Sequence, residues 1–145
     1  MSTRPLEFED LNQQFYDLIA QNKDIDFTIQ ISSKHRNQCW DKYTQDPNLA
    51  VYVYNDKNHG VTGIASIVAY PKLFFYNESF ATIQQIVVDK NFQNSKIAVS
   101  LVTRCINYAK KMKCSKVVCA CGTKNVKFYE QCGFNKCSYL MEKVL

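Results

Sequence analysis

The 145-residue sequence holds no apolar run that approaches the roughly 20 consecutive residues needed by a membrane-spanning helix. It also lacks the apolar core of a secretory signal peptide, because the first ten residues are mostly polar or charged. No internal repeat, low-complexity tract or linker interrupts it. We therefore expect one compact domain over residues 1–145, located in the cytoplasm and not in a membrane.

Histidine is scarce: the two residues, His35 and His59, lie far from the cysteines in sequence. The seven cysteines are odd in number and scattered, which argues against a disulfide scaffold. Cys119 and Cys121 are separated by one residue in a predicted strand, so their side chains would share a face, and that spacing suits neither a CxxC redox site nor a zinc site. We expect no metal site and reduced thiols that pack as small hydrophobic groups.

The formal net charge of +5 is mild. It favours an anionic ligand, but it also fits a solvated surface with no such role. The lysines are spread along the chain instead of forming a basic arm, and no nucleic-acid-binding motif is recognisable. A nucleic-acid partner is therefore not expected.

Hydrophobic periodicity predicts alternating helices and strands. The predicted helices run from an N-cap at Asp10 to about Gln21, from Ser33 to about Tyr43, over 95–113, and over Asn125–Cys132 with Gly133 as C-cap. The predicted strands are Leu49–Asn55, Val61–Tyr70, Phe80–Val88, Lys116–Ala120 and Lys136–Lys143. This order predicts an α/β fold, a mixed central sheet flanked by helices.

One strand–loop–helix junction can bind phosphate. The strand that ends at Val88 passes through the loop Asp89–Ser95 into the amphipathic helix 95–113. The free backbone N–H groups and the positive dipole end of a helix N-terminus attract phosphate groups. Most α/β proteins contain such a junction, so this feature alone does not establish a function.

The segment Asn125-Val-Lys-Phe-Tyr-Glu-Gln-Cys-Gly-Phe134 carries the second feature. Its periodicity places Val126 and Tyr129 on one helix face, which is typical of a core tyrosine. Alternatively, the Tyr129 phenol acts as a general acid beside the phosphate site.

This segment, about thirty residues after the strand–loop–helix junction, resembles the signature of the GNAT superfamily of N-acetyltransferases. The closest pattern is that of glucosamine-6-phosphate N-acetyltransferases. The resemblance covers residues 67–141 well and the first 60 residues loosely. It implies the GNAT acyl-CoA N-acyltransferase fold and acetyl-CoA as co-substrate.

The resemblance also implies which residues bind acetyl-CoA. Ile86, Val87 and Val88 would present backbone groups of a splayed strand to the pantetheine and the thioester carbonyl. Asn94, Ser95, Lys96, Ile97, Ala98 and Val99 would surround the pyrophosphate. Asn125 and Tyr129 would lie near the sulfur, with Tyr129 protonating the departing thiolate after direct attack by the amine.

Four positions depart from the family pattern. Lys96 replaces a glycine of the pyrophosphate loop, so the coenzyme must be held differently there. Gln84 and Gln85 replace an acidic pair, and Ala120 replaces a further carboxylate. Amides accept hydrogen bonds but take no proton, so the general base is left unassigned.

For the acceptor, the resemblance implies a phosphorylated aminosugar. The residues implied to bind it are Asn22, Lys72, Leu73, Phe74, Phe75, Gln84, Gln85, Ile86, Ser115, Lys116 and Lys143. Each lysine considered alone is typical of an ordinary surface residue.

The leading hypothesis is acetylation of D-glucosamine 6-phosphate, a step towards UDP-N-acetylglucosamine. The alternatives are a GNAT enzyme for another amine (a polyamine, another aminosugar or a protein N-terminus) and a non-catalytic CoA-binding GNAT domain. The resemblance further implies a homodimer, which the apolar run at Tyr139, Leu140, Met141, Val144 and Leu145 favours.

Overall fold

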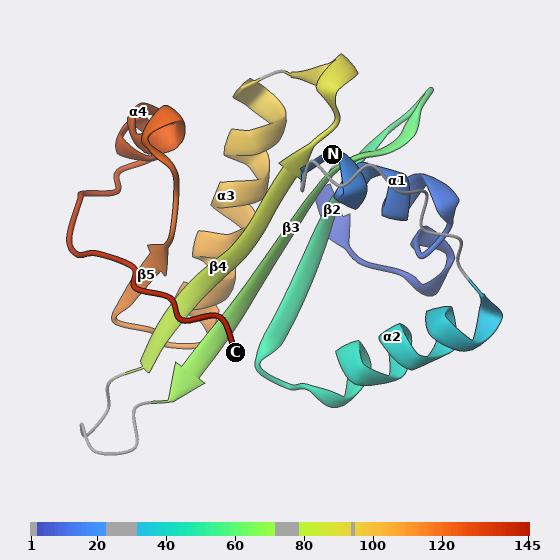
Figure 1. Ribbon diagram of the computed structural model, residues 1–145, viewed down its shortest axis with the longest axis horizontal. Helices are drawn as coiled ribbons and strands as arrows, with labels where there is room; N and C mark the ends of the chain where they lie inside the picture. The colour runs from blue at the N-terminus through green and yellow to red at the C-terminus, as the bar shows by residue number, and fades with distance from the viewer. Residues whose placement is uncertain (1–2, 23–31, 72–78, 94) are drawn as a thin grey trace.

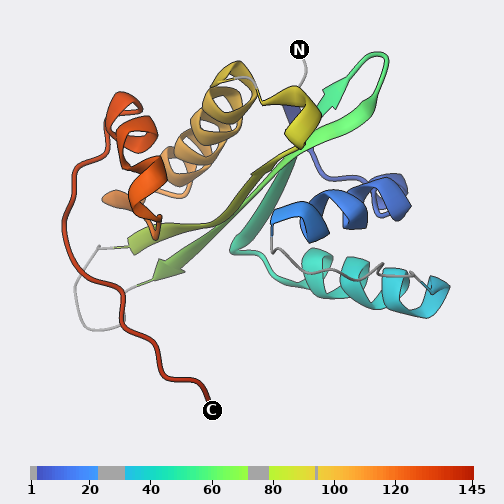
Figure 2. The same cartoon turned by 45° about the horizontal axis from the view of Figure 1, so that its top comes forward.

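The computed structural model describes residues 3–22, 32–71, 79–93 and 95–145. A five-stranded sheet has the order β1–β2–β3–β4–β5, antiparallel throughout except for the parallel pair β4–β5. The strands are β1 (Thr3–Pro5), β2 (Leu49–Asp56), β3 (Gly60–Pro71), β4 (Ser79–Val88) and β5 (Lys116–Cys119). The α-helices are α1 (Gln13–Asn22), α2 (Ser33–Gln45), α3 (Ser95–Lys111) and α4 (Val126–Gln131). A mixed sheet with helices on its two faces confirms the predicted α/β class (Figure 1 and Figure 2).

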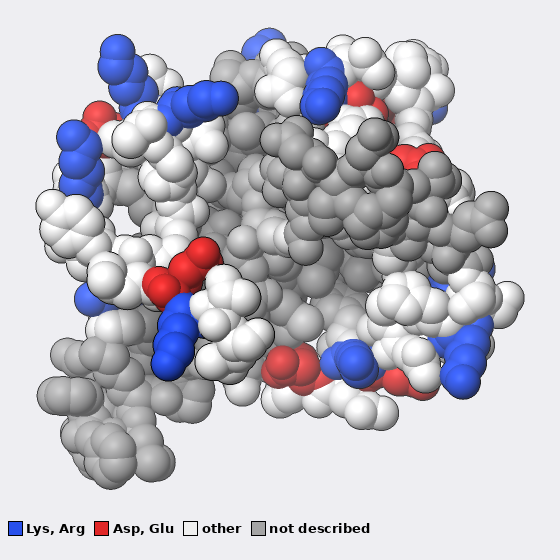
Figure 3. Space-filling model, in the orientation of Figure 1, with Lys and Arg blue, Asp and Glu red and all other residues white. Residues whose placement is uncertain are grey.

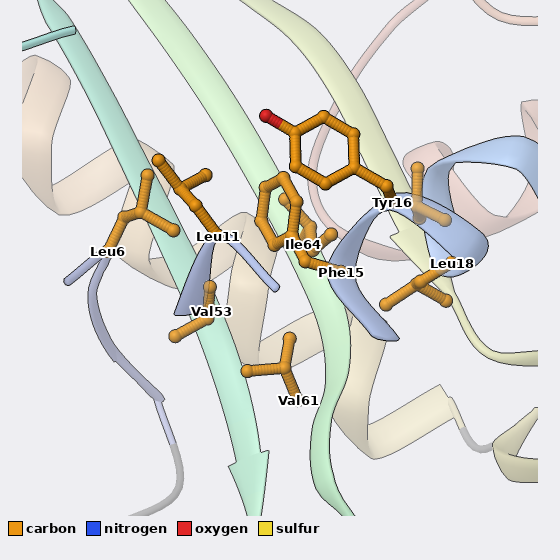
Figure 4. Close-up of a cluster of buried hydrophobic side chains, with 9 residues drawn as sticks. Leu6, Leu11, Phe15, Tyr16, Leu18, Val53, Val61 and Ile64 are labelled. Carbon is orange, nitrogen blue, oxygen red and sulfur yellow. The ribbon is translucent and has the colours of Figure 1, made fainter. Parts of the chain in front are cut away.

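The sheet separates two hydrophobic layers. On one face, Phe15 and Leu18 of α1 pack against the strands together with Leu11, which precedes the helix, as Figure 4 shows. On the other face, α3 packs Ile97, Leu101, Cys105 and Ala109 against alternate residues of β3 and β4. Because successive strand residues point to opposite faces, a single strand supplies both layers.

The packing of α3 on β3 depends on a glycine. A Cβ atom added at Gly63 would lie 2.8 Å from Ile97 Cγ2 and 3.0 Å from Leu101 Cδ1. Such distances are shorter than an ordinary van der Waals contact. The missing side chain therefore lets the first half of α3 approach the end of the sheet where β4 stops.

The chain before α1 is held by an ion pair. Arg4 Nη1 and Nη2 donate to the two carboxylate oxygens of Asp10 at 2.7 and 2.9 Å. The Glu7 N–H donates to the same carboxylate at 2.8 Å. Burial alone would raise the pKa of Asp10, but these hydrogen bonds outweigh it and lower the pKa below its ordinary value. The pair ties β1 to the 3₁₀ turn Phe8–Asp10.

The structure of this region differs from the sequence prediction in two ways. The strand β1 was not predicted, since it has three residues and includes a proline. Asp10 does not cap α1: Asn12 accepts a hydrogen bond from the Phe15 N–H through Oδ1 at 3.2 Å, as an N-cap residue does. Asp10 is instead used by Arg4 and Glu7.

The predicted strand Lys136–Lys143 is also wrong. Residues 134–145, which we term the tail, carry no regular secondary structure. A strand requires a hydrogen-bonding neighbour as well as alternating apolar residues, and no other described strand pairs with the tail. The tail is extended and crosses in front of β5 and β4 in Figure 1. The bounds of the other predicted elements agree with the structure to within two residues.

Candidate active site

The strand β4 carries a bulge in the middle of the predicted site. Ser66 on β3 lies opposite Gln85, and the next β3 residue, Ile67, lies opposite Ile83, so Gln84 is an extra residue. A bulge bends the strand and redirects the side chains that follow it. Gln84 is exposed and Gln85 is half-buried.

Beyond the bulge, β4 and β5 separate. Their parallel pairing spans Phe80–Ile83 and Lys116–Cys119, and β5 ends there. Over the part of the chain that the structure describes, no strand pairs with residues 84–88 on that side of β4. The result is an open backbone edge at the end of the sheet where α3 begins. This is the splayed strand that the family resemblance implied.

The short segment between β4 and α3 is built from local hydrogen bonds. Asp89 caps the 3₁₀ turn Lys90–Phe92 by accepting from the Asn91 N–H at 2.9 Å. Gln93 Nε2 donates to the carbonyl oxygen of Val88 at 3.0 Å. These contacts direct the chain from the open edge of β4 into the N-terminus of α3.

The residues expected to bind acetyl-CoA lie in different environments. Val87 is buried in the layer beneath α1, whereas Ile86 and Val88 pack on the α3 layer. Ile97 is a core residue against Gly63, so only its backbone is available to a ligand.

Other members of this set lie on or near α3. Lys96 and Val99 are exposed in the first turns of α3, and Ala98 is half-buried. Asn94 lies outside the described residues. Ser95 begins α3, but its side chain lies outside the described part of the structure.

Tyr129 is fixed by the end of α4. The Phe134 N–H donates to the carbonyl of Tyr129 and the Gly133 N–H to that of Glu130, both at 3.0 Å. Gly133 has φ of +91°, in the left-handed region that favours glycine. These two bonds form a Schellman motif, which confirms the predicted glycine C-cap. The motif brings the Phe134 ring to 5.5 Å from the Tyr129 ring, and the Phe128 ring lies at 5.1 Å.

The Tyr129 side chain is half-buried, so its phenol is partly shielded from water. Burial raises the pKa of Tyr129 above its ordinary value, and nearby thiols add to the rise. Burial also raises the pKa of the Cys119 thiol to about 11, although a hydrogen bond with Tyr129 acts against that rise. Both groups are therefore neutral at physiological pH. A neutral phenol is the form that can donate a proton.

Tyr129 lines a cleft of about 790 Å³ between β5, α4 and the tail. The other lining residues are Thr82, Val117, Val118, Cys119, Ala120, Cys121, Gly122, Val126, Glu130, Phe134, Asn135, Lys136, Cys137, Ser138, Tyr139 and Leu140. This volume falls within the range of about 300–1,000 Å³ typical of small-molecule sites. Val126 and Tyr129 share the cleft face of α4, as their spacing predicted.

The cleft brings together only part of the predicted site. Tyr129 and Ala120 line it, whereas Ile86, Val88 and Lys96 are not among its lining residues. Asn125 is exposed at the N-terminus of α4, and its side chain makes no capping hydrogen bond. The open edge of β4 and the cleft are therefore two separate features, both on the side of the sheet where β4 and β5 lie.

The residues expected to bind the acceptor phosphate are partly engaged elsewhere. Ser115 donates to the carbonyl of Ser79 from its backbone N–H at 2.8 Å and from Oγ at 3.3 Å. The Lys116 ammonium lies 4.0 Å from the centroid of the Phe80 ring. Lys143 is exposed in the tail.

Five further acceptor candidates are not placed. Lys72, Leu73, Phe74 and Phe75 lie outside the described residues. Asn22 ends α1, but its side chain also lies outside the described part.

Sequence reasoning did not identify Thr82, Glu130 and Lys136 as residues of one cleft. The position of Glu130, directly after Tyr129 in a helix, was the available signal. Lys136 joins the cleft only because the tail runs across β5, and no local pattern encodes that path.

The remaining polar chemistry does not form a metal centre. Within residues 3–22, 32–71, 79–93 and 95–145, no group of three His, Cys, Asp or Glu side chains is arranged to hold a metal ion. The cysteines are free thiols, and burial raises the pKa of Cys105 to about 12. No helix in these ranges is long and apolar enough to cross a bilayer.

On the face drawn in Figure 3, lysine and arginine side chains lie at separate places around the edge of the molecule. Acidic side chains lie between some of them. The described residues of this face therefore form no continuous basic stripe of the kind that follows a nucleic-acid backbone.

Comparison with known proteins relates this geometry to a family. The model of the Acetyltransferase (GNAT) family matches residues 10–134. The Glucosamine 6-phosphate N-acetyltransferase of Arabidopsis thaliana is 25% identical over 142 residues, which cover 97% of this chain and 93% of that protein. The Glucosamine 6-phosphate N-acetyltransferase 1 of Dictyostelium discoideum is 23% identical over 136 residues, which cover 94% of this chain and 85% of that protein.

Solved structures agree at the level of the fold. The crystal structure of glucosamine-6-phosphate N-acetyltransferase from Arabidopsis thaliana superimposes with a TM-score of 0.89 at 22% identity, covering 98% of this chain and 96% of that one. A crystal structure of a Trypanosoma brucei acetyltransferase superimposes with a TM-score of 0.88 at 22% identity, covering 99% of this chain and 98% of that one. At such identities the similarity establishes a common fold and does not specify an acceptor.

Proposed function

Because the chain belongs to the GNAT family of acetyltransferases, we propose that it acetylates the amine of D-glucosamine 6-phosphate and releases CoA and N-acetyl-D-glucosamine 6-phosphate. Acetyl transfer is the activity of the family. The observation that carries the transfer chemistry is Tyr129, a half-buried phenol with a raised pKa on a cleft beside the separating strands β4 and β5. The acceptor is supported by the names of several relatives that are 23–27% identical to this chain.

The described residues fit acetyl-CoA. The open edge of β4 offers backbone groups from Gln84 to Val87 that could pair with the amides of the pantetheine arm, whereas the Val88 carbonyl already accepts from Gln93 Nε2. The N-terminus of α3, which follows within a few residues, offers N–H groups to a pyrophosphate. The exposed ammonium of Lys96 supplies a positive charge where the family has glycine. Acetyl-CoA, when bound, supplies the acetyl group as a thioester.

The chemistry requires three roles from the protein. A backbone N–H on the open edge of β4 stabilises the oxyanion that forms at the thioester carbonyl. The Tyr129 phenol donates a proton to the departing sulfur, and its raised pKa keeps it protonated for that task. The third role is removal of a proton from the acceptor ammonium, for which Gln84, Gln85 and Ala120 provide no carboxylate.

A second candidate is a GNAT enzyme that acetylates another amine. Its support is the replacement of acidic residues of the family by Gln84, Gln85 and Ala120. A polyamine, another aminosugar or a protein N-terminus would each be acetylated from the same coenzyme site. The candidates therefore differ in acceptor and not in the role of Tyr129.

The deciding experiment is mass-spectrometric detection of N-acetylglucosamine 6-phosphate after incubation with acetyl-CoA and glucosamine 6-phosphate. We expect product that accumulates with time and much less from unphosphorylated glucosamine. A thiol-reactive dye is unsuitable because the protein has seven free thiols of its own. If other amines are acetylated but no N-acetylglucosamine 6-phosphate forms, the second candidate function is supported instead. Acetyl-CoA binding without any acetylated product would indicate a non-catalytic domain.

A further inference from the structure

The cleft contains one negatively and one positively charged side chain. Among its lining residues, Glu130 is the single carboxylate and Lys136 is the single ammonium. The other lining residues are glycine or have apolar or neutral polar side chains, including the phenol of Tyr129 and the hydroxyl of Thr82. Two opposite charges in one small cleft suit a ligand that carries both charges itself.

Both charged groups are available to a ligand. Glu130 and Lys136 are exposed, and neither forms an ion pair with another residue of the described chain. Glu130 follows Tyr129 on α4, and the Gly133 N–H that closes α4 donates to the Glu130 backbone carbonyl at 3.0 Å. The backbone of Glu130 is thus held by the same motif that fixes Tyr129, while its carboxylate stays free.

Several other residues expected near the acceptor are engaged or chemically unsuited. Gln84, Gln85 and Ala120 cannot accept a proton. Ser115 uses its N–H and its hydroxyl on the Ser79 carbonyl, and the Lys116 ammonium faces the Phe80 ring. Within the cleft, Glu130 is therefore the available proton acceptor and Lys136 the available anion-binding group.

Building on the proposed function, we infer that Glu130 receives the acceptor's ammonium and its proton, and that Lys136 binds the acceptor's phosphate. The cleft then selects acceptors that combine an amine with an anionic group. Selection by charge pairing places the amine on the side of α4, because Glu130 and Tyr129 both line the cleft from that helix. Lys136 comes from the tail, so the tail contributes to acceptor specificity.

The protons balance in this scheme. Glu130 takes one of the three ammonium protons and passes it to water. The freed nitrogen lone pair forms the C–N bond at the thioester carbonyl carbon, and the C–S bond breaks. Tyr129 donates its proton to the departing sulfur. The second proton lost by the nitrogen restores the Tyr129 phenol, and the third stays on the amide.

Other titratable groups face the same space and define what a pH profile reports. They are Tyr129 on α4, Cys119 on β5, Cys121 after it, and Lys136 and Cys137 on the tail. Burial raises the pKa of both Tyr129 and Cys119, so neither ionises in the range where an aminosugar amine titrates. In the pH range where the acceptor amine titrates, we therefore expect loss of the Glu130 carboxylate to change the rate according to how much of the acceptor is protonated.

The test compares Glu130→Gln with Glu142→Gln, a matched change at an exposed tail carboxylate outside the cleft. We expect Glu130→Gln to lower kcat/KM for glucosamine 6-phosphate about a hundredfold at pH values where the acceptor is an ammonium. The deficit should narrow as pH rises, because more of the acceptor is then already a free amine. Glu142→Gln should follow the wild-type profile. Thermal unfolding of both variants should match wild type, because both side chains are exposed.

The Lys136 half is tested by Lys136→Met against Lys127→Met, an exposed lysine of α4 outside the cleft. We expect Lys136→Met to raise KM about tenfold for the phosphorylated acceptor. The KM for unphosphorylated glucosamine should not change, and Lys136→Arg should retain the phosphate preference. The inference is overturned if either cleft variant behaves like its control, or if Lys136→Met affects both acceptors equally. If the wild-type protein does not acetylate glucosamine 6-phosphate, both the proposed function and this inference are overturned. If the wild type is active and the Glu130 and Lys136 variants have wild-type kinetics, only the inference is overturned.

Discussion

The partial burial of Tyr129 fits the acid role that we propose for it. Desolvation disfavours the phenolate, so the pKa rises and the proton is retained well above neutral pH. The rings of Phe128 and Phe134 pack edge-on against the Tyr129 ring, with centroids at 5.1 and 5.5 Å. The same burial would suit a purely structural tyrosine, so the two roles must be separated by experiment.

Tyr129→Phe removes the hydroxyl and leaves the ring contacts in place. We expect turnover to fall about a hundredfold or more, whereas acetyl-CoA affinity should change little because no binding contact is assigned to the hydroxyl. Steady-state kinetics and calorimetric titration of acetyl-CoA measure the two quantities. Unchanged turnover would return Tyr129 to a packing role.

Arg4 and Asp10 form an ion pair with two short hydrogen bonds. Because the pKa of Asp10 is lowered in the folded protein, the pair stabilises the fold above the ordinary pKa of an aspartate, near 3.9, and that stabilisation is lost as pH falls through the lowered value. Arg4→Gln should reduce the free energy of unfolding by about 1–3 kcal/mol at neutral pH. The difference from wild type should shrink on acidification.

Urea unfolding at pH 7 and near pH 3 checks this expectation. Lys34→Gln, a change at an exposed position of α2, is a suitable control and should alter stability little at either pH. A deficit of Arg4→Gln that is equal at both pH values would show that lost packing and not charge is responsible.

At the scale of elements, the contact between α3 and β3 positions the N-terminus of α3, where we propose that the coenzyme pyrophosphate binds. Gly63→Ala places a methyl group against Ile97 and Leu101, so either the helix or these side chains must move. We expect a loss of about 1–3 kcal/mol in unfolding free energy and weaker acetyl-CoA binding, because the N-terminus of α3 shifts away from β4. Thermal unfolding and calorimetry measure both effects.

Gly122→Ala is the matched control for this change. A Cβ atom at Gly122 meets no atom within 4 Å, and its backbone φ of −74° suits any residue. The control should therefore keep wild-type stability. Equal stability of the two alanine variants would contradict the close approach of α3.

Elements with a strong periodic pattern could be predicted from the sequence. The apolar stripe of residues 95–113 and the alternating runs of the central strands depend on local side-chain order, so α3, β2, β3 and β4 agree with expectation. β1 and the absence of a final strand depend on pairing partners far along the chain, which local periodicity does not encode. The two cleft residues differ for the same reason. Tyr129 could be predicted because its motif is local, whereas Lys136 could not, because it lies in the cleft only through the path of the tail.

At the scale of the whole molecule, the tail exposes an apolar run. Tyr139 is 95% exposed and Met141 is 88% exposed, with Leu140, Val144 and Leu145 similarly uncovered. Such a contiguous surface is typical of an interface. We propose that a second copy of the chain covers it, as the family resemblance implied.

Sedimentation at micromolar concentration should therefore give a species at twice the 16.8 kDa mass of the chain. The double variant Leu140→Glu, Met141→Glu should shift it towards the single-chain mass, because charges cannot be buried unpaired in an apolar interface. Tyr70→Glu, at an exposed aromatic outside the tail, should not. A single-chain mass for the wild type would exclude this dimer.

The strand order of the sheet follows the order of the chain, and this has a consequence for synthesis on the ribosome. The antiparallel strands β2, β3 and β4 each pair with a strand already made, so most of the sheet can form while later residues are still being translated. The lining of the cleft, in contrast, begins at Val117 apart from Thr82. A growing chain thus makes its packed sheet before it makes β5, α4 and the tail, so a nascent chain can hold the sheet core while it still lacks the lining of the cleft.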